Sequence, residues 1–169
     1  MKNLINIFLV LFFSTSSLAF AEFPNSVEKK FLIGSATLKF LRMKVYDISL
    51  WSVEPKFSYS KPFAIQIKYN MNFSSQDLVK RSIAEIERLH ELTGEEKKSY
   101  AKDLAIIFRS VKKGDEKLAI FSPEKGVKML YNNELTGVIS DPKLARLFVD
   151  IWLDERGSYP EVTRKLLGK

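Results

Sequence analysis

The chain has 169 residues, a formal net charge of +7 and no cysteine. A chain without cysteine forms no disulfide and has no thiolate for catalysis or metal binding. The basic residues are spread along the sequence rather than gathered with aromatic residues into a dense patch, so nucleic acid is not an expected partner.

The amino terminus has the pattern of a secretory signal peptide. Lys2 precedes an apolar run over residues 4–13, and small residues follow at Ala19 and Ala21. The run is about half of the ~20 apolar residues that a membrane-spanning helix needs. We therefore expect a signal peptide over residues 1–21, export, one domain over residues 22–169, and no stable membrane insertion once the signal is cleaved.

Strands are expected in the first part of the exported chain. The stretch GSATLKFLRMKVYDISLW, residues 34–51, has alternating apolar side chains that change phase near residues 41–44, which predicts two strands joined by a tight turn or bulge. In FAIQIKYNM, residues 63–71, every second side chain is apolar or aromatic from Phe63 to Tyr69. This alternation is typical of a strand with one buried face.

Helices are expected next, and three short motifs mark helix starts. Each places an acidic residue three positions after a hydroxyl residue, as in a capping box: Ser74 with Asp77, Thr93 with Glu96, and Ser158 with Glu161. The first two motifs predict helices over about residues 76–91 and 95–109. Apolar residues at helical spacing form their inner faces: Val79, Ile83 and Ile86 in the first, and Tyr100, Leu104, Ile107 and Phe108 in the second.

The last third of the chain predicts a β-meander followed by two helices. Short apolar runs between residues 118 and 140 are separated by turn residues. Asp141 followed by Pro142 is a favourable helix start, and a last short helix is expected in YPEVTRKLLG, residues 159–168. The predicted fold class is α+β, an antiparallel sheet with a layer of helices on one face.

Known catalytic and metal-binding motifs are missing from the sequence. His90 is the only histidine, and no HExxH-like arrangement surrounds it, so a helix-end histidine is the expected role. No nucleophile elbow, phosphate-binding loop or dinucleotide fingerprint occurs. We therefore expect no metal and no cofactor, and we assign no catalytic residue.

Stretches spread over residues 33–168 carry a resemblance to a known family. They include IGSATLKFLRMKVYDISLW, FAIQIKYNMNFSSQDLVKRSIAEI, GVISDPKLARLFVDIWL and the terminal RKLLG. Together they resemble the chalcone isomerase-like family, and in particular its exported bacterial branch. The resemblance implies an open-faced β-sandwich and, with the signal peptide, a periplasmic location.

The family's G-x-G-x-R motif is altered in this chain. Gly34 matches the first glycine, Ala36 replaces the second, and Leu38 stands at the arginine, whereas the KVY motif is intact over residues 44–46. In true chalcone isomerases that arginine is implicated in stabilising the substrate's phenolate, a role that needs a fixed cation. Leu38 cannot supply that charge, so the resemblance favours a member without the isomerase activity.

The resemblance also assigns a role to Tyr46. True isomerases are similar in having a threonine at this position, whereas the non-catalytic fatty-acid-binding relatives have a tyrosine that helps to hold a carboxylate. The family's further catalytic tyrosine and asparagine have no counterpart in residues 73–81. The resemblance therefore implies a non-catalytic protein that binds a fatty acid or another lipophilic small molecule.

The candidate ligand-binding residues line an expected apolar cleft between sheet and helices. They are Leu38, Lys39, Phe40, Tyr46, Ile48, Tyr69 and Ile83. Strand alternation puts Lys39 on the opposite face from Leu38, so Lys39 reaches the cleft only through a bulge and is otherwise a solvated strand residue, as is Arg42 in the turn.

Two other functions remain open at this point. The first is an isomerase or lyase on an unknown substrate, with Tyr46, Tyr69 or Lys39 as the acid or base. The second is a periplasmic structural or interaction protein that has a filled core and no ligand. The same apolar residues would serve a filled core equally well.

Overall fold

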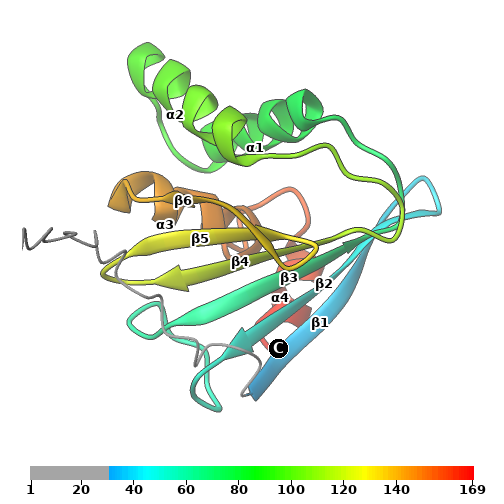
Figure 1. Cartoon of the computed structure of the whole chain (residues 1–169). Coiled ribbons are helices and arrows are strands. Elements are labelled where there is room, and N and C mark those ends of the chain that lie inside the picture. The colour runs from blue at the N-terminus through cyan, green and yellow to red at the C-terminus, as the bar shows by residue number, and fades with distance from the viewer. Residues whose placement is uncertain (1–30) are drawn as a thin grey trace, which may run out of the picture.

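The structure, a computed structural model, describes residues 31–169. These residues form a six-stranded antiparallel sheet and four helices (Figure 1). The strands pair in chain order: β1 (Phe31–Phe40), β2 (Met43–Ser52), β3 (Phe63–Tyr69), β4 (Glu116–Ser122), β5 (Gly126–Tyr131) and β6 (Glu134–Ile139). The helices are α1 (Ser75–Leu89), α2 (Gly94–Ile107), α3 (Pro142–Leu153) and α4 (Pro160–Leu166). The predicted α+β class, with its meander and its two pairs of helices, is confirmed.

The helices pack on one face of the sheet, and most buried apolar side chains of the described residues form one core between the two layers. Within residues 31–169, no helix is both long and apolar enough to cross a membrane. The predicted signal peptide, residues 1–21, lies outside the described residues.

A two-residue turn joins β1 and β2, as the phase change in the sequence predicts. Leu41 and Arg42 form this turn, and their φ angles are 46° and 69°, in the left-handed region. Phe40 and Met43 face each other across the hairpin on either side of it. Two consecutive residues with positive φ are typical of a type I′ hairpin turn, whose twist matches that of the strands.

Of the three predicted capping boxes, Thr93 with Glu96 forms both bonds, and Ser74 with Asp77 forms only the bond to the hydroxyl. The hydroxyl of Ser74 accepts a hydrogen bond from the Asp77 N–H at 3.0 Å, at the start of α1. At the start of α2, Thr93 Oγ1 accepts from the Glu96 N–H at 3.1 Å, and Glu96 Oε2 accepts from the Thr93 N–H at 2.9 Å. These bonds satisfy backbone donors that have no partner inside the helix.

The third predicted motif, Ser158 with Glu161, is wrong. Tyr159 is the N-cap of α4, and no side chain caps it. Pro160 takes the first helical position, where a residue without an N–H fits well, so the helix starts one residue later than predicted. Ser158 instead donates two hydrogen bonds to the Glu85 carboxylate, from its N–H at 2.7 Å and from its hydroxyl at 2.6 Å. These bonds tie α1 to the segment before α4.

The close packing of α4 on β1 depends on Gly34. A Cβ at this position would lie 2.0 Å from the backbone oxygen of Lys165 and 2.6 Å from that of Leu166. A side chain larger than hydrogen would therefore push the helix off the sheet. This contact fixes α4 above β1, and Val162 and Thr163 of α4 then form part of the cavity wall described below.

Candidate functional site

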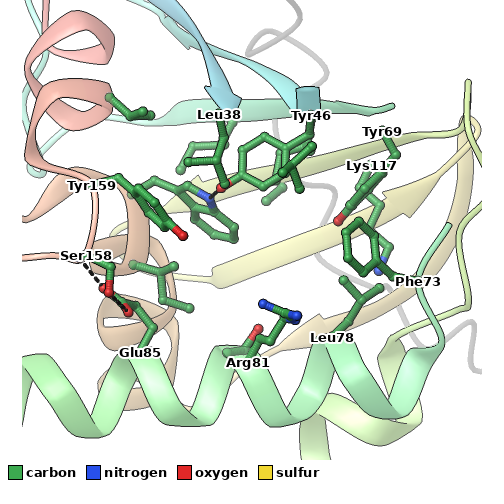
Figure 2. A pocket seen from close by; sticks show the side chains of 18 of the residues that line it. Leu38, Tyr46, Tyr69, Phe73, Leu78, Arg81, Glu85, Lys117, Ser158 and Tyr159 are labelled. Carbon is green, nitrogen blue, oxygen red and sulfur yellow. Dashed lines mark hydrogen bonds between the residues drawn. The ribbon is translucent and has the colours of Figure 1, made fainter. Parts of the chain in front are cut away.

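A cavity of about 570 Å³ lies between the sheet and helices α1, α3 and α4. Figure 2 shows the side chains that face it from the strands and the helices. Most of its walls are apolar, with contributions that include Leu38, Ile65, Ile67, Ala119 and Met129 from the strands and Leu78, Phe148, Ile151, Trp152 and Val162 from the helices. This size and lining are typical of a site for a lipophilic small molecule.

The opening of the cavity is marked by its exposed lining residues. Phe40 and Met43 lie on the β1–β2 hairpin and Arg81 lies in the first half of α1, whereas Arg88 lies in the last turn of α1, near the exposed Ser158 and Tyr159 before α4. The hairpin and the start of α1 lie at the same end of the sheet, because β2 begins where its neighbour β3 ends (Figure 1). The exposed lining residues of the hairpin and of the first half of α1 therefore mark one opening of the cavity.

Four of the predicted binding residues line the cavity: Leu38, Phe40, Tyr46 and Tyr69. The other three do not. Ile48 is buried in the core farther along β2, and Lys39 is exposed on β1, on the face opposite to Leu38. A register shift does occur between Leu38 and Lys39, but it does not bring the Lys39 side chain into the cavity.

Ile83 misses the cavity because of its place on α1. Leu78, Ser82 and Glu85 follow helical spacing and line the cavity, whereas Ile83 and Ile86 are buried on another side of the helix. The sequence pattern correctly identifies Ile83 as inward-facing. It does not show that α1 has two inward sides, one against the core and one against the cavity.

Tyr46 faces the cavity opposite Leu38, its partner in the β1–β2 register. Its hydroxyl accepts a hydrogen bond from the indole N–H of Trp152 on α3 at 3.1 Å, and its ring meets the Tyr69 ring edge-on at 6.2 Å. Burial raises the pKa of Tyr46 to about 12, and burial also raises the pKa of Tyr69. Both phenols are therefore neutral at physiological pH.

Lys117 on β4 is a cavity-lining cation that sequence reasoning missed. Its side chain reaches the inner face of the sheet, close to Tyr69 and Phe73 (Figure 2), and the residue is only 5% exposed. Its ammonium lies 4.3 Å from the ring centre of Phe108 and 5.9 Å from that of Tyr69. No oxygen or nitrogen of the described residues forms a hydrogen bond with it.

Burial of this ammonium changes its acid–base behaviour. Desolvation, with a smaller contribution from the charge of Arg109, lowers the pKa of Lys117 to about 8. Lys117 is therefore still mainly protonated at neutral pH, although aromatic rings are its only partners among residues 31–169. A buried charge without an anion is unfavourable, so an anion placed beside it would be bound strongly.

Two other charged groups of the cavity wall differ from Lys117. Glu85 already receives the hydrogen bonds of Ser158 and lies 3.4 Å from Arg88, so its charge is compensated. Arg81 is exposed and has its guanidinium over the Phe73 ring at 5.9 Å, without an ion pair among residues 31–169. Lys117 is the deep cation of the cavity, and Arg81 is the cation at its opening.

Comparison with protein families gives a match over residues 26–168 to the model described as chalcone isomerase-like. The chain belongs to the chalcone isomerase-like family. Among solved structures, the fold is similar to that of a fatty-acid binding protein from Arabidopsis thaliana, with a TM-score of 0.62 and 10% sequence identity over 81% of this chain and 86% of that chain. A comparison with curated protein sequences gives no significant match.

The family assignment makes the contrast between Leu38 and Lys117 informative. The position that resembles the family's arginine does face the cavity, but Leu38 leaves it without a charge. Lys117 places a cation on a different strand of the same cavity, since β4 pairs with β3, and Ile67 lies opposite Lys117 in that register. The cavity of this chain therefore has a buried positive charge on β4 and none at residue 38.

The sequence around Lys117 explains why it was missed. In EKLAIFS, residues 116–122, both alternating sets contain apolar side chains, because Leu118 and Ile120 pack in a second, smaller apolar cluster apart from the main core. Lys117 shares its face with Ala119 and Phe121. The periodicity alone does not decide which set faces the helices. The sequence does place Lys117 in the same alternating set as Phe121. This pattern indicates a buried lysine only when the set that faces the helices is already known.

Proposed function

We propose that this protein is a non-catalytic binding protein for a fatty acid or a similar lipophilic molecule with one anionic group. The observation that carries the proposal is the buried, unpartnered ammonium of Lys117 in the wall of an otherwise apolar cavity. An apolar cavity with one or two polar groups is the usual composition of such a site. The anionic group would pair with Lys117, and the hydrocarbon part would contact the apolar walls.

The energetics favour an anionic ligand over a neutral one. A charge-assisted hydrogen bond in a low-dielectric site is stronger than the same bond in water. A carboxylate beside Lys117 would also remove the unfavourable state of a buried charge that has only aromatic neighbours. The fatty-acid binding protein of similar fold supports this ligand class.

The properties of the tyrosines favour binding over proton-transfer chemistry. An isomerase or lyase needs an acid or a base in the cavity, and the sequence offers Tyr46, Tyr69 and Lys39 as candidates. The raised pKa values of the two tyrosines make the phenolate forms rare at neutral pH. Lys39, the third candidate, is exposed on the outer side of β1 and does not line the cavity.

We further propose that the protein is exported to the periplasm as a member of the bacterial branch of its family. The support is the signal-peptide pattern over residues 1–21. In that compartment a chain without cysteine needs no disulfide machinery. Amino-terminal sequencing of the secreted product, beginning at Glu22, tests the cleavage site.

Native mass spectrometry with lipid extraction tests the ligand directly. The full chain is expressed with its own amino terminus, and the processed protein is purified without detergent. We expect a co-purifying acyl species, or a mass shift when palmitate is added, and we expect Lys117→Met to lose it while the control Lys39→Met retains it. The proposal would be contradicted if the unmodified protein showed the mass of the polypeptide alone and this mass did not change when palmitate was added.

A further inference from the structure

The turn between β1 and β2 exposes a group of large apolar side chains. Leu41 is 77% exposed, Phe40 54% and Met43 50%. We call residues 39–44 the hairpin tip. Exposed apolar residues that occur singly need no explanation, but three within four positions of one turn form a patch. Because Phe40 and Met43 also line the cavity, this patch adjoins the cavity opening.

Comparison with the second tight hairpin of the molecule shows that the hairpin tip is unusual. Asn132 and Asn133 join β5 and β6 with φ angles of 47° and 70°, almost the same as the 46° and 69° of Leu41 and Arg42. Asparagine tolerates the left-handed region, whereas leucine and arginine are strained there. The β5–β6 turn therefore has residues suited to its geometry, and the β1–β2 turn does not.

The hairpin tip also carries positive charge. Lys39, Arg42 and Lys44 are all exposed, and none of them forms an ion pair with the described part of the chain. The carboxylate of Asp47, farther along β2, is held by hydrogen bonds from Thr37 and Asn70. Large apolar side chains surrounded by lysine and arginine are the composition of a segment that binds the interface of an anionic membrane.

We propose that the hairpin tip docks on an anionic phospholipid bilayer. Its apolar side chains enter the interfacial region, and its cations contact the headgroup phosphates. Strained residues that the local fold does not require are a sign of function, and at such a surface the exposed leucine and arginine would both gain partners. Docking would bring the cavity opening against the bilayer, where fatty acids reside, and this last step rests on the proposed function.

Vesicle co-sedimentation tests the docking. The probes are vesicles of phosphatidylglycerol mixed equally with phosphatidylcholine, and vesicles of phosphatidylcholine alone. The variant Leu41→Asn/Arg42→Gly installs residues that suit the turn, so it should fold with a raised Tm. We expect it to bind the anionic vesicles on the order of tenfold more weakly than the unmodified protein, because it loses one apolar and one cationic contact.

A matched variant controls for general loss of apolar and cationic surface. Leu135→Asn/Arg164→Gln removes a leucine that is 60% exposed and an exposed arginine, both outside the hairpin tip. It should bind the anionic vesicles as well as the unmodified protein, and phosphatidylcholine alone should bind none of the proteins. Equal binding by the two variants, or self-association of the protein without vesicle binding, would overturn the docking proposal.

Docking and ligand binding can fail separately. Lys117→Met leaves the hairpin tip intact, so it should retain vesicle binding after losing palmitate. Leu41→Asn/Arg42→Gly changes no cavity-lining residue, so it should still bind palmitate added in solution but take it up more slowly from anionic vesicles. Vesicle binding without any palmitate binding would leave docking standing and remove the proposed function.

Discussion

Two buried charges of this molecule have opposite surroundings. Asp150 on α3 is 4% exposed, and Lys117 on β4 is 5% exposed. The Asp150 carboxylate accepts hydrogen bonds from the Tyr59 hydroxyl at 2.8 Å and from Arg146 Nε at 2.9 Å, and His90 Nε2 lies 3.5 Å from it. In the described part of the chain, the ammonium of Lys117 has only the faces of two aromatic rings as partners.

The difference agrees with a structural role for Asp150 and with the binding role that we propose for Lys117. Asp150 is compensated by groups of the chain itself, which connect α3 with the end of α1 and with the β2–β3 segment. Burying a charge is tolerable when the fold provides its partners. Lys117 faces a cavity, and the fold provides no anion for it. Asp150 should therefore matter most for stability, and Lys117 for binding.

The largest expected effect is on stability at Asp150. Asp150→Ala removes the common acceptor of two donors, so we expect the free energy of unfolding to fall by about 3 to 5 kcal/mol. Denaturant unfolding measures the change. Glu124→Ala, at an exposed acidic residue of the β4–β5 turn, should change it by less than about 0.5 kcal/mol. If Asp150→Ala lowered the free energy of unfolding no more than Glu124→Ala, Asp150 would have no structural role.

Lys117 should behave in the opposite way. Its pKa falls from 10.5 to about 8 on folding, so at neutral pH the charged form opposes folding by up to about 3 kcal/mol. Lys117→Met should therefore stabilise the delipidated protein by an amount on the order of 2 to 3 kcal/mol while weakening the binding of an anionic ligand. If Lys117→Met instead lowered stability, the aromatic rings would be sufficient partners for the ammonium.

The pH dependence of stability provides a smaller signal of the same kind. Between pH 8 and 10.5 the unfolded chain holds more of the Lys117 proton than the folded chain does, so stability should rise with pH in that window. The rise should be about 2 kcal/mol between about pH 8 and 9.5. Urea unfolding of the delipidated protein at several pH values measures this rise in the free energy of unfolding. The rise should be absent in Lys117→Met. A rise of equal size in that variant would assign the effect to other groups.

The elements of this fold were predictable from the sequence because they are marked by local chemistry. Hydroxyl residues before an acidic residue gave the starts of α1 and α2, and Asp141 followed by Pro142 gave the start of α3. The prediction failed at Ser158, where a proline two residues later competed for the first helical position. Local rules predict where a helix starts unless two of them point to different residues, as the capping motif at Ser158 and the preference for proline at the first helical position do here.

The site was less predictable than the fold, because a cavity depends on which of several inner faces is left uncovered. Tyr46 and Leu38 were identified through the family's motif, and both face the cavity. Ile48 and Ile83 are equally apolar and equally in phase, yet they fill the core. Lys117 carries no motif, and its role follows only from the three-dimensional burial of its ammonium.

The most direct test of the account compares decanoate with decanol, two ligands of equal chain length of which only one is charged. Their affinities are measured by calorimetry for the unmodified protein, for Lys117→Met and for Arg81→Gln. We expect Lys117→Met to lower the affinity for decanoate by about 10- to 100-fold and to change the affinity for decanol little. Arg81→Gln should lower the affinity for decanoate by less than about fivefold. Equal losses for both ligands in Lys117→Met, or no loss for either, would contradict the assignment of Lys117 as the group that binds the ligand's charge.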